Sequence, residues 1–344
     1  LSEAFCNESM YLFFEGHTPI EYIPKLCYDL KKWQVNIPRH CQKIYFNDNV
    51  KIPSTFVRSD NHKLLRNQTH VDRFFPYGLK SITFGSNFNF PIPEGLFPNS
   101  LEKLIFGKKF NQPLTKGMIP KTLKYLIFGV NFNQKLTPNV LPKGLKSLIF
   151  GRNYSYCLED NFLPEGLEYL RLGDNYTHPL TKDTLPKNLL GLNLGIKFNH
   201  PLTGVLPSTL KILILSQNFR EPLLEGDIPE NVIYLRFGNM YQEYLPENIF
   251  PKKLECLAFK TDYRKRIIRS GMLPDSLKIL FLTVYYSLDG GILPPNLTDF
   301  YYKTYYDVFS HEQPTLSALP TLPSTIKKVY FNGKRLNSSE TDGY

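Results

Sequence analysis

The chain has 344 residues, of which 42% are hydrophobic, so it contains enough apolar material for a sizeable core. Its formal net charge of +10 leaves binding to a polyanion open, while the absence of any run of about 18 apolar residues excludes a membrane-spanning helix. The five cysteines, at positions 6, 27, 41, 157 and 256, lack the paired spacing of a metal site, and we expect a reduced, intracellular protein.

Residues 1–75 fit no regular pattern along most of their length. Two short stretches, around Leu30 and around Ile44, have apolar residues at the spacing of the repeats that follow, and the polar stretch 58–73 matches no repeat. Terminal units of repeat arrays are usually atypical because one of their faces meets water. We therefore interpret 1–75 as a degenerate N-terminal cap with an inserted loop.

A repeating unit occupies residues 76–300. In 119–136, IPKTLKYLIFGVNFNQKL, an apolar residue and a proline are followed by two leucines three residues apart, a phenylalanine, a glycine and a second aromatic residue. The proline recurs at 76, 98, 120, 142, 164, 186, 207, 229, 251, 274 and 294, most often 22 residues after the one before. A fixed period of this size indicates a solenoid of stacked units.

The apolar columns of these units predict the core. The positions of Leu126 and Phe128 are apolar in every unit, and the position of Phe132 is aromatic in every unit. One unit cannot bury such a face alone, but stacked neighbours bury it for one another. We therefore expect these side chains to point inward.

The strand period predicts a parallel sheet. Leu104, Ile105 and Phe106 alternate inward, outward and inward, and successive units run in the same direction. In seven units a glycine follows the strand and allows a turn that a side chain would hinder, at 85, 107, 129, 151, 173, 195 and 238; Lys260, Thr283 and Lys303 replace it in later units. The prolines disfavour a helix in the return arm. The predicted fold is a β-rich solenoid with one parallel sheet of about 11 regular 22-residue repeats.

Residues 301–344 are expected to close the C-terminal end. Ile326, Val329 and Phe331 have the spacing of a last unit, the aromatic stretch 301–322 precedes them, and 336–344 is polar. We interpret this segment as a C-terminal cap followed by a polar tail that frays.

Two repeat families resemble this pattern. The spacing Leu-x-x-Leu-x-Leu/Phe-x-x-Asn resembles leucine-rich repeats, with asparagines at 87, 131, 153, 175 and 218. The stretches FNFPI, FNQPL, FNQKL and FNHPL resemble more closely the FNIP repeats of amoebae and giant DNA viruses. The resemblance implies a leucine-rich-repeat-like solenoid in which these asparagine amides bond to the backbone of the next turn. Many relatives carry an F-box, which recruits a ubiquitin ligase; the stretch 20–33 matches one only weakly.

No catalytic motif recurs along the chain. A nucleophile, a base and an orienting residue never occur together, and there is no phosphate-binding loop. We therefore predict a protein that is not an enzyme and needs no cofactor. One column, His178, His200, Glu221 and Glu243, has residue types that bind metals, and adjacent strands would bring them to about 5 Å. Because the same column holds Phe90 in an earlier unit, a solvated column is preferred to a metal site.

The outward face of the sheet is the candidate partner-binding surface. An exposed row of isoleucines beside tyrosines and arginines has the composition of an interface core, although β-branched residues suit any strand. The residues expected to contact a partner are Lys103, Ile105, Tyr125, Ile127, Ile149, Tyr169, Arg171, Asn193, Ile214, Tyr234 and Arg236.

The preferred hypothesis is a non-catalytic protein-interaction module that presents this face to a partner protein. The alternatives are a structural component of a virion or cellular assembly, the substrate-recognition part of an F-box ubiquitin ligase, and a nucleic-acid-binding protein. The scattered lysines, which alternate with glutamates, disfavour nucleic acid. The expected location is the cytoplasm, or the host cytoplasm or virion for a viral protein. No membrane contact is expected, and homo-oligomerisation stays open.

Overall fold

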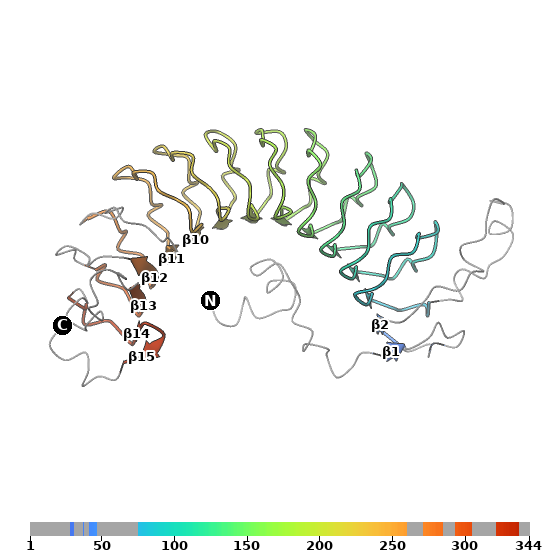
Figure 1. Ribbon diagram of the computed structural model, residues 1–344, viewed down its shortest axis with the longest axis horizontal. Coiled ribbons are helices and arrows are strands. Elements are labelled where there is room, and N and C mark those ends of the chain that lie inside the picture. Colours follow the sequence, from blue (N-terminus) through green and yellow to red (C-terminus); the bar gives the residue numbers. More distant parts are fainter. Residues whose placement is uncertain are drawn as a thin grey trace, which may run out of the picture. The chain divides into compact units, whose positions relative to one another are not determined.

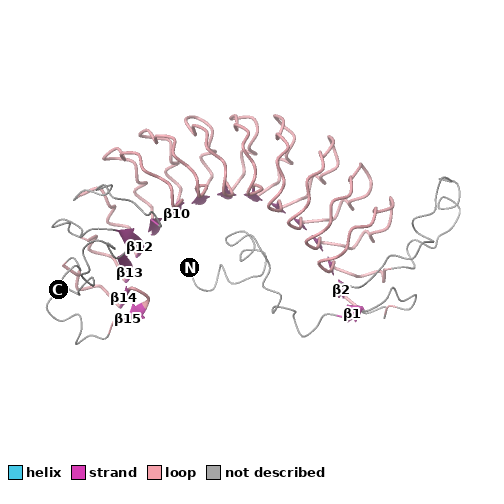
Figure 2. Cartoon of the chain, in the orientation of Figure 1, coloured by secondary structure: helices cyan, strands magenta, loops and turns pink. Residues whose placement is uncertain are grey.

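The computed structural model describes residues 28–30, 37, 41–46, 75–259, 271–284, 293–304 and 321–336. The chain divides into two compact units, Leu1–His178 and Pro179–Tyr344, called unit 1 and unit 2 below. Each is a stack of similar turns, with one short strand per turn (Figure 1). The described residues contain strands, turns and irregular segments but no helix, as predicted for the return arms (Figure 2).

Unit 1 contains seven strands that follow one another in chain order within the described residues. They are β1 (Tyr28–Leu30), β2 (Lys43–Phe46), β3 (Ser81–Thr83), β4 (Lys103–Ile105), β5 (Tyr125–Ile127), β6 (Ser147–Ile149) and β7 (Tyr169–Arg171). Each strand pairs in parallel with the next, and equivalent residues lie side by side, as Leu104 does beside Leu126. The strands β1 and β2 pair in the same way, so the repeat pattern extends into the N-terminal segment.

Unit 2 continues the pattern as a stack of its own. Its strands are β8 (Gly191–Asn193), β9 (Ile212–Ile214), β10 (Tyr234–Phe237), β11 (Cys256–Phe259), β12 (Ile279–Val284), β13 (Asp299–Thr304), β14 (Lys328–Phe331) and β15 (Lys334–Arg335). β8 to β14 pair in parallel, and β14 supplies the last turn expected after Pro323. β13 runs across the expected boundary between residues 300 and 301.

A hairpin ends the sheet of unit 2. β15 pairs with β14 antiparallel through a turn at Asn332 and Gly333, whose φ angles of 49° and 85° are those of a two-residue hairpin turn. The amide of Leu336 then donates to the carbonyl of Val329. The exposed Lys334 and Arg335 therefore cover the open strand edge, which protects a sheet from further pairing.

The predicted period is confirmed. The eleven strands β3 to β13 begin at residues 81, 103, 125, 147, 169, 191, 212, 234, 256, 279 and 299, with the same spacings as the eleven prolines. The inserted loop (58–73), Cys6 and Cys27, most of the weak F-box match (20–33), the stretch 305–320 and the tail from 337 lie outside the described residues.

Two aromatic columns fill the core of unit 1. The inward rings that follow the strands stack on their equivalents, with centroids 5.7 to 5.8 Å apart from Phe84 to Phe150. Each ring also stacks on the aromatic residue four positions later, at 3.8 Å for Phe106 and Phe110. The leucine column beside them is fully buried, and the side chain of Leu126 is 0% exposed. The predicted inward columns are therefore confirmed.

The turns of unit 1 spread apart on the core side of the sheet. Neighbouring strands lie about 4.8 Å apart, whereas the rings of Phe106 and Phe128 lie 5.8 Å apart. A stack that spreads on one face of its sheet must converge on the other. Within unit 1 the strands accordingly lie on the inner side of the curved stack, and the loops lie on its outer side (Figure 2).

Glycine recurs at two positions of the repeat for two different physical reasons. A Cβ on Gly129 would lie 1.9 Å from the carbonyl oxygen of Gly107 in the preceding turn, so glycine is required there by the close approach of two backbones. Gly107, Gly151 and Gly238 are as close to the preceding turn, whereas Ser216 occupies this position after β9. In the return arms, a second column needs a left-handed backbone. It holds Gly117 at φ 94° and Asn139 at φ 63°, the residue types that adopt this conformation most readily.

A ladder of asparagines joins successive turns. The Oδ1 atom of Asn111 accepts hydrogen bonds from the backbone amide of Asn133 at 2.9 Å and from Nε2 of Gln134 at 3.1 Å. Asn89 bonds in the same way to the turn after it. The column expected to contact the backbone, which contains Asn153 and Asn175, instead forms side-chain bonds between neighbouring asparagines. The asparagine of the FN dipeptide is thus the one that holds the next backbone.

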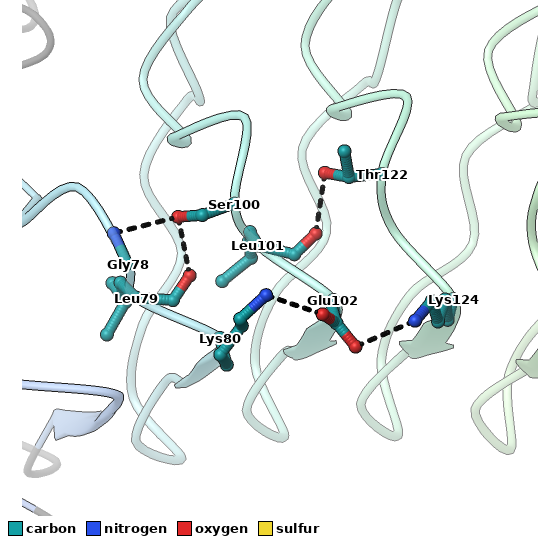
Figure 3. A network of polar contacts seen from close by, with 8 residues as sticks. All are labelled: Gly78, Leu79, Lys80, Ser100, Leu101, Glu102, Thr122 and Lys124. Atoms are coloured by element: carbon teal, nitrogen blue, oxygen red, sulfur yellow. Dashed lines mark hydrogen bonds and ion pairs between the residues drawn. The ribbon is translucent and has the colours of Figure 1, made fainter.

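Hydroxyl groups and ion pairs join neighbouring turns near the start of β3, β4 and β5 (Figure 3). The hydroxyl of Thr122 donates to the carbonyl of Leu101 at 2.8 Å. The carboxylate of Glu102 pairs with Lys80 at 2.7 Å and with Lys124 at 3.0 Å, and these hydrogen bonds lower its pKa. Exposed ion pairs contribute at most about 1 kcal/mol each, so they mainly help to align neighbouring turns.

The asparagine ladder makes a testable contribution to stability. Asn111→Ala should lower the free energy of unfolding by about 1–2 kcal/mol, because the amide of Asn133 loses its acceptor in a half-buried position. Asn99→Ala, in an exposed turn, is the matched control and should change stability by less than about 0.5 kcal/mol. Urea unfolding of both variants measures the difference. Equal midpoints would show that the ladder does not stabilise the stack.

Candidate functional site: the outward face of the strands

The outward face of unit 1 consists of two rows of side chains that point away from the leucine core. The central row and the flanking row each contribute one residue per strand, two positions apart. The central row holds Thr83, Ile105, Ile127, Ile149 and Arg171, and the flanking row holds Ser81, Lys103, Tyr125, Ser147 and Tyr169.

The central row is not exposed as the sequence suggested. The side chains of Ile105, Ile127 and Ile149 are only 5%, 4% and 2% exposed. We attribute this to the convergence of the turns on this face, which presses each side chain against its neighbours on the adjacent strands. The prediction of an exposed isoleucine stripe was therefore wrong. Lysine substitutions here would bury charge and would test the fold rather than partner binding.

Arg171 interrupts the isoleucines with a buried charge. Its side chain is 6% exposed, and Nη2 donates to Oδ1 of Asp174 at 2.7 Å. Nη1 donates to the carbonyl of Leu172 at 3.3 Å, and the other carboxylate oxygen of Asp174 lies 3.4 Å from Nε of Arg152. Because buried charges persist when they are paired, this arrangement explains how an arginine fits the row. Nη1 and Nη2 of Arg171 are thus bonded within unit 1, whereas its buried Nε has no hydrogen-bond partner.

The flanking row is the accessible part of the outward face in unit 1. Lys103 and Tyr169 are half-buried, Tyr125 is 36% exposed, and Ser147 between the two tyrosines is buried. Burial raises the pKa of Tyr169, and the charges of Glu168 and of Tyr125 raise it further. The Tyr169 hydroxyl therefore stays protonated over a wider range of pH than that of an isolated tyrosine, and it remains a hydrogen-bond donor.

In unit 2 the predicted residues also divide into buried and accessible ones. Asn193 and Ile214 are 2% and 1% exposed, and Oδ1 of Asn193 accepts the backbone amide of Gly195 at 3.0 Å. Tyr234 and Arg236 are half-exposed. The structure thus leaves five of the eleven predicted contact residues accessible, namely Lys103, Tyr125, Tyr169, Tyr234 and Arg236.

The sequence-based site missed a row of stacked aromatic rings on the outward face of unit 2. The rings of Phe281 and Tyr301 lie 4.1 Å apart at 15°, and those of Tyr301 and Tyr330 lie 4.6 Å apart at 7°. All three residues are half-buried. Their outward position was available from the repeat alignment, but their exposure was not, because neighbours decide it.

The described residues provide no evidence for metal chemistry. Among them, no group of three or more His, Cys, Asp or Glu side chains could hold a metal ion. Nε2 of His178 lies 2.8 Å from the carbonyl oxygen of Ser155, and Glu221 accepts a hydrogen bond from Asn199. Cys41, Cys157 and Cys256 are free thiols, and burial raises the pKa of Cys256 to about 12. No helix in the described part of the chain has the length and apolar character that crossing a membrane requires.

Comparison with known proteins identifies the repeat. The family model of the FNIP repeat matches residues 67–109, 110–153, 132–175, 154–197 and 198–240, which together make up just over half of the chain. The chain belongs to the FNIP repeat family. The asparagine that joins the turns of this FNIP repeat protein is the second residue of the motif that the family is named for. A comparison with curated proteins gave no match.

Solved structures similar to this FNIP repeat protein are leucine-rich repeat proteins. CroV588, a circular leucine-rich repeat protein, is 28% identical with a TM-score of 0.64 over 87% of this chain, which spans 45% of the length of CroV588. YopM from Yersinia enterocolitica is 18% identical over 74% of this chain and 73% of its own, with a TM-score of 0.40. YopM from Yersinia pestis is 20% identical over 75% and 84%, with a TM-score of 0.41. The similarity to CroV588 shows that the parallel-sheet solenoid is leucine-rich-repeat-like.

Proposed function

We propose that this FNIP repeat protein is a non-catalytic module that binds a partner protein through the outward face of its strands. The observation that carries the proposal is the accessible flanking row of Lys103, Tyr125 and Tyr169 in unit 1. Tyrosine offers a large contact area and a hydroxyl donor at a small cost in side-chain entropy, and it is enriched in interfaces.

The fold supports the same proposal. Solenoids of the leucine-rich-repeat type are typical of protein-interaction modules and scaffolds rather than of enzymes. In unit 1 the rows are held by strand pairing, by the asparagine ladder and by the Lys80–Glu102–Lys124 ion pairs. A surface held in this way loses little conformational freedom when a partner binds. A cytoplasmic location remains part of the proposal.

The proposal predicts that partner binding depends on the flanking row. The double variant Tyr125→Ala and Tyr169→Ala should reduce capture of at least one cellular protein by about tenfold, since centrally placed aromatic contacts dominate interfaces. Tyr77→Ala is the matched control, because Tyr77 is 86% exposed and lies in a turn before the strand. Quantitative mass spectrometry of proteins captured from lysate with wild type and both variants measures the effect. Equal capture by all three proteins, with unchanged thermal melting, would contradict the proposal.

A further inference from the structure

The outward face of unit 2 contains a row that runs from Arg236 to Arg335; Ala258 within it is buried, and beyond Arg236 the same column continues with the buried Ile214. The strand register places Arg236 beside Ala258, Ala258 beside Phe281, and so on through Tyr301 and Tyr330 to Arg335. We call these six residues the aromatic row. At about 4.8 Å per strand, its five intervals span about 24 Å, the length of about seven residues of an extended peptide.

The rings of the aromatic row leave their edges accessible. On this face the centroids of Tyr301 and Tyr330 are 4.6 Å apart, whereas on the core face those of Tyr302 and Phe331 are 6.1 Å apart. The turns therefore converge here as they do in unit 1, and each ring covers the face of the next. Because the three residues are nevertheless half-exposed, the surface they offer consists of ring edges and the tyrosine hydroxyls.

The tyrosine hydroxyls of this row are suited to donate hydrogen bonds. Burial, followed by the charges of Asp299 and Tyr330, raises the pKa of Tyr301. The hydroxyl is therefore protonated at neutral pH and can donate to a carboxylate. The one carboxylate beside it in the described structure, Asp299, is paired with Lys328 at 3.1 Å.

The described residues around the C-terminal part of the aromatic row, on and beside β12 to β15, carry a net positive charge. The described residues of 271–284, 293–304 and 321–336 include six Lys or Arg and two Asp. They are Lys278, Lys303, Lys327, Lys328, Lys334, Arg335, Asp275 and Asp299. Two of these cations form ion pairs, Lys278 with Glu255 at 3.0 Å and Lys328 with Asp299 at 3.1 Å, much as lysines pair with glutamates in unit 1. The end of unit 2 thus complements a negatively charged ligand.

We propose that the aromatic row binds an acidic, extended segment of the partner protein. This inference rests on the proposed function and adds the chemistry of the ligand. Its carboxylates pair with Arg236 and Arg335 and accept hydrogen bonds from the tyrosine hydroxyls, while its apolar side chains lie against the ring edges. A single-stranded nucleic acid fits less well, because its bases stack on free ring faces and these faces already stack on one another.

A fluorescein-labelled peptide of sequence EEYEEFEE tests the inference by fluorescence anisotropy with the full chain. The wild type should bind this peptide at least tenfold more tightly than the control peptide KKYKKFKK. Tyr301→Ser with Tyr330→Ser should weaken binding at least tenfold. Arg335→Glu should also weaken binding at least tenfold, without disturbing the stacked rings, because Arg335 is exposed at the end of the row. Arg335→Lys should recover most of the affinity.

Matched controls and a nucleic-acid probe make the test decisive. Tyr77→Ser with Lys121→Gln removes a hydroxyl and a charge from exposed turns of unit 1 and should leave peptide binding unchanged. No binding of EEYEEFEE, or equal binding by wild type and Arg335→Glu, would overturn the inference. Tighter binding of a dT20 oligonucleotide than of EEYEEFEE, dependent on the same residues, would also overturn the inference. Should the double serine variant fail to fold, Arg335→Glu alone decides.

The result is separable from the test of the proposed function. Capture of a cellular protein that depends on Tyr125 and Tyr169, without binding of the acidic peptide, would keep the proposed function and overturn the inference. Binding of the peptide without such capture would support the aromatic row and count against the flanking row of unit 1.

Discussion

Gly129→Ala should destabilise unit 1 by more than about 3 kcal/mol, the upper end of the usual cost of overpacking. The new methyl carbon would lie 1.9 Å from the carbonyl oxygen and 2.5 Å from the carbonyl carbon of Gly107. Both contacts are with backbone atoms that are themselves held by the stack, so no side-chain rotation can relieve the clash. Two turns would have to separate, and the aromatic stacking of Phe106 on Phe128 would be disturbed as well.

Gly144→Ala provides the control for this variant. A Cβ at Gly144 would lie 3.7 Å from the carbonyl oxygen of Lys121, an ordinary van der Waals distance. Because alanine restricts the unfolded chain, this substitution should be neutral or stabilising by up to about 1 kcal/mol. Urea unfolding followed by circular dichroism compares the two. Similar midpoints for Gly129→Ala and Gly144→Ala would mean that the turns are not packed as closely as the structure shows.

Leu126→Asp should abolish cooperative folding of unit 1. The side chain of Leu126 is 0% exposed and lies between Leu104 and Leu148 in the strand register. An aspartate there would put a carboxylate into an apolar column with no cation to pair with, at a cost of more than about 4 kcal/mol. In a solenoid, stability comes from the interfaces between neighbouring units, so one such defect weakens the contacts on both of its sides.

The comparison for Leu126→Asp is Lys121→Asp, which changes an exposed residue of the same turn. We expect Lys121→Asp to resist limited proteolysis like the parent, and Leu126→Asp to be cleaved rapidly within residues 75–178. If both variants have the same protease resistance and the same urea midpoint, the inward register of the leucine column is wrong.

The period of the sequence was enough to predict the repeat architecture. In a solenoid each unit meets copies of itself, so the chemistry of one turn specifies the contacts of its neighbours. The position of Leu126 predicted a buried column, and the column is buried. The alternation around Ile105 predicted a parallel sheet with equivalent residues side by side, and Ile105 indeed lies beside Ile127.

The repeat pattern predicted the chemical roles of the asparagines and glycines less well. Both the asparagine column of Asn153 and that of Asn111 occur with the period of the repeat, and only the geometry of the turn shows which amide reaches a backbone N–H group. Gly107, Gly129 and Gly151 were expected for the turn after a strand, whereas the structure shows that each is required by the backbone of the preceding turn.

What the sequence by itself determined is the set of residues that share a column and the face on which they lie, because the repeat period and the strand alternation are local properties of the chain. Only the tertiary structure decided which outward residues are accessible. Ile127 and Tyr301 occupy the same column, yet the isoleucine is buried and the tyrosine is half-exposed. The physical reason is that the turns converge on the outward face, so a short side chain is covered by its neighbours while a stacked aromatic ring still presents its edge.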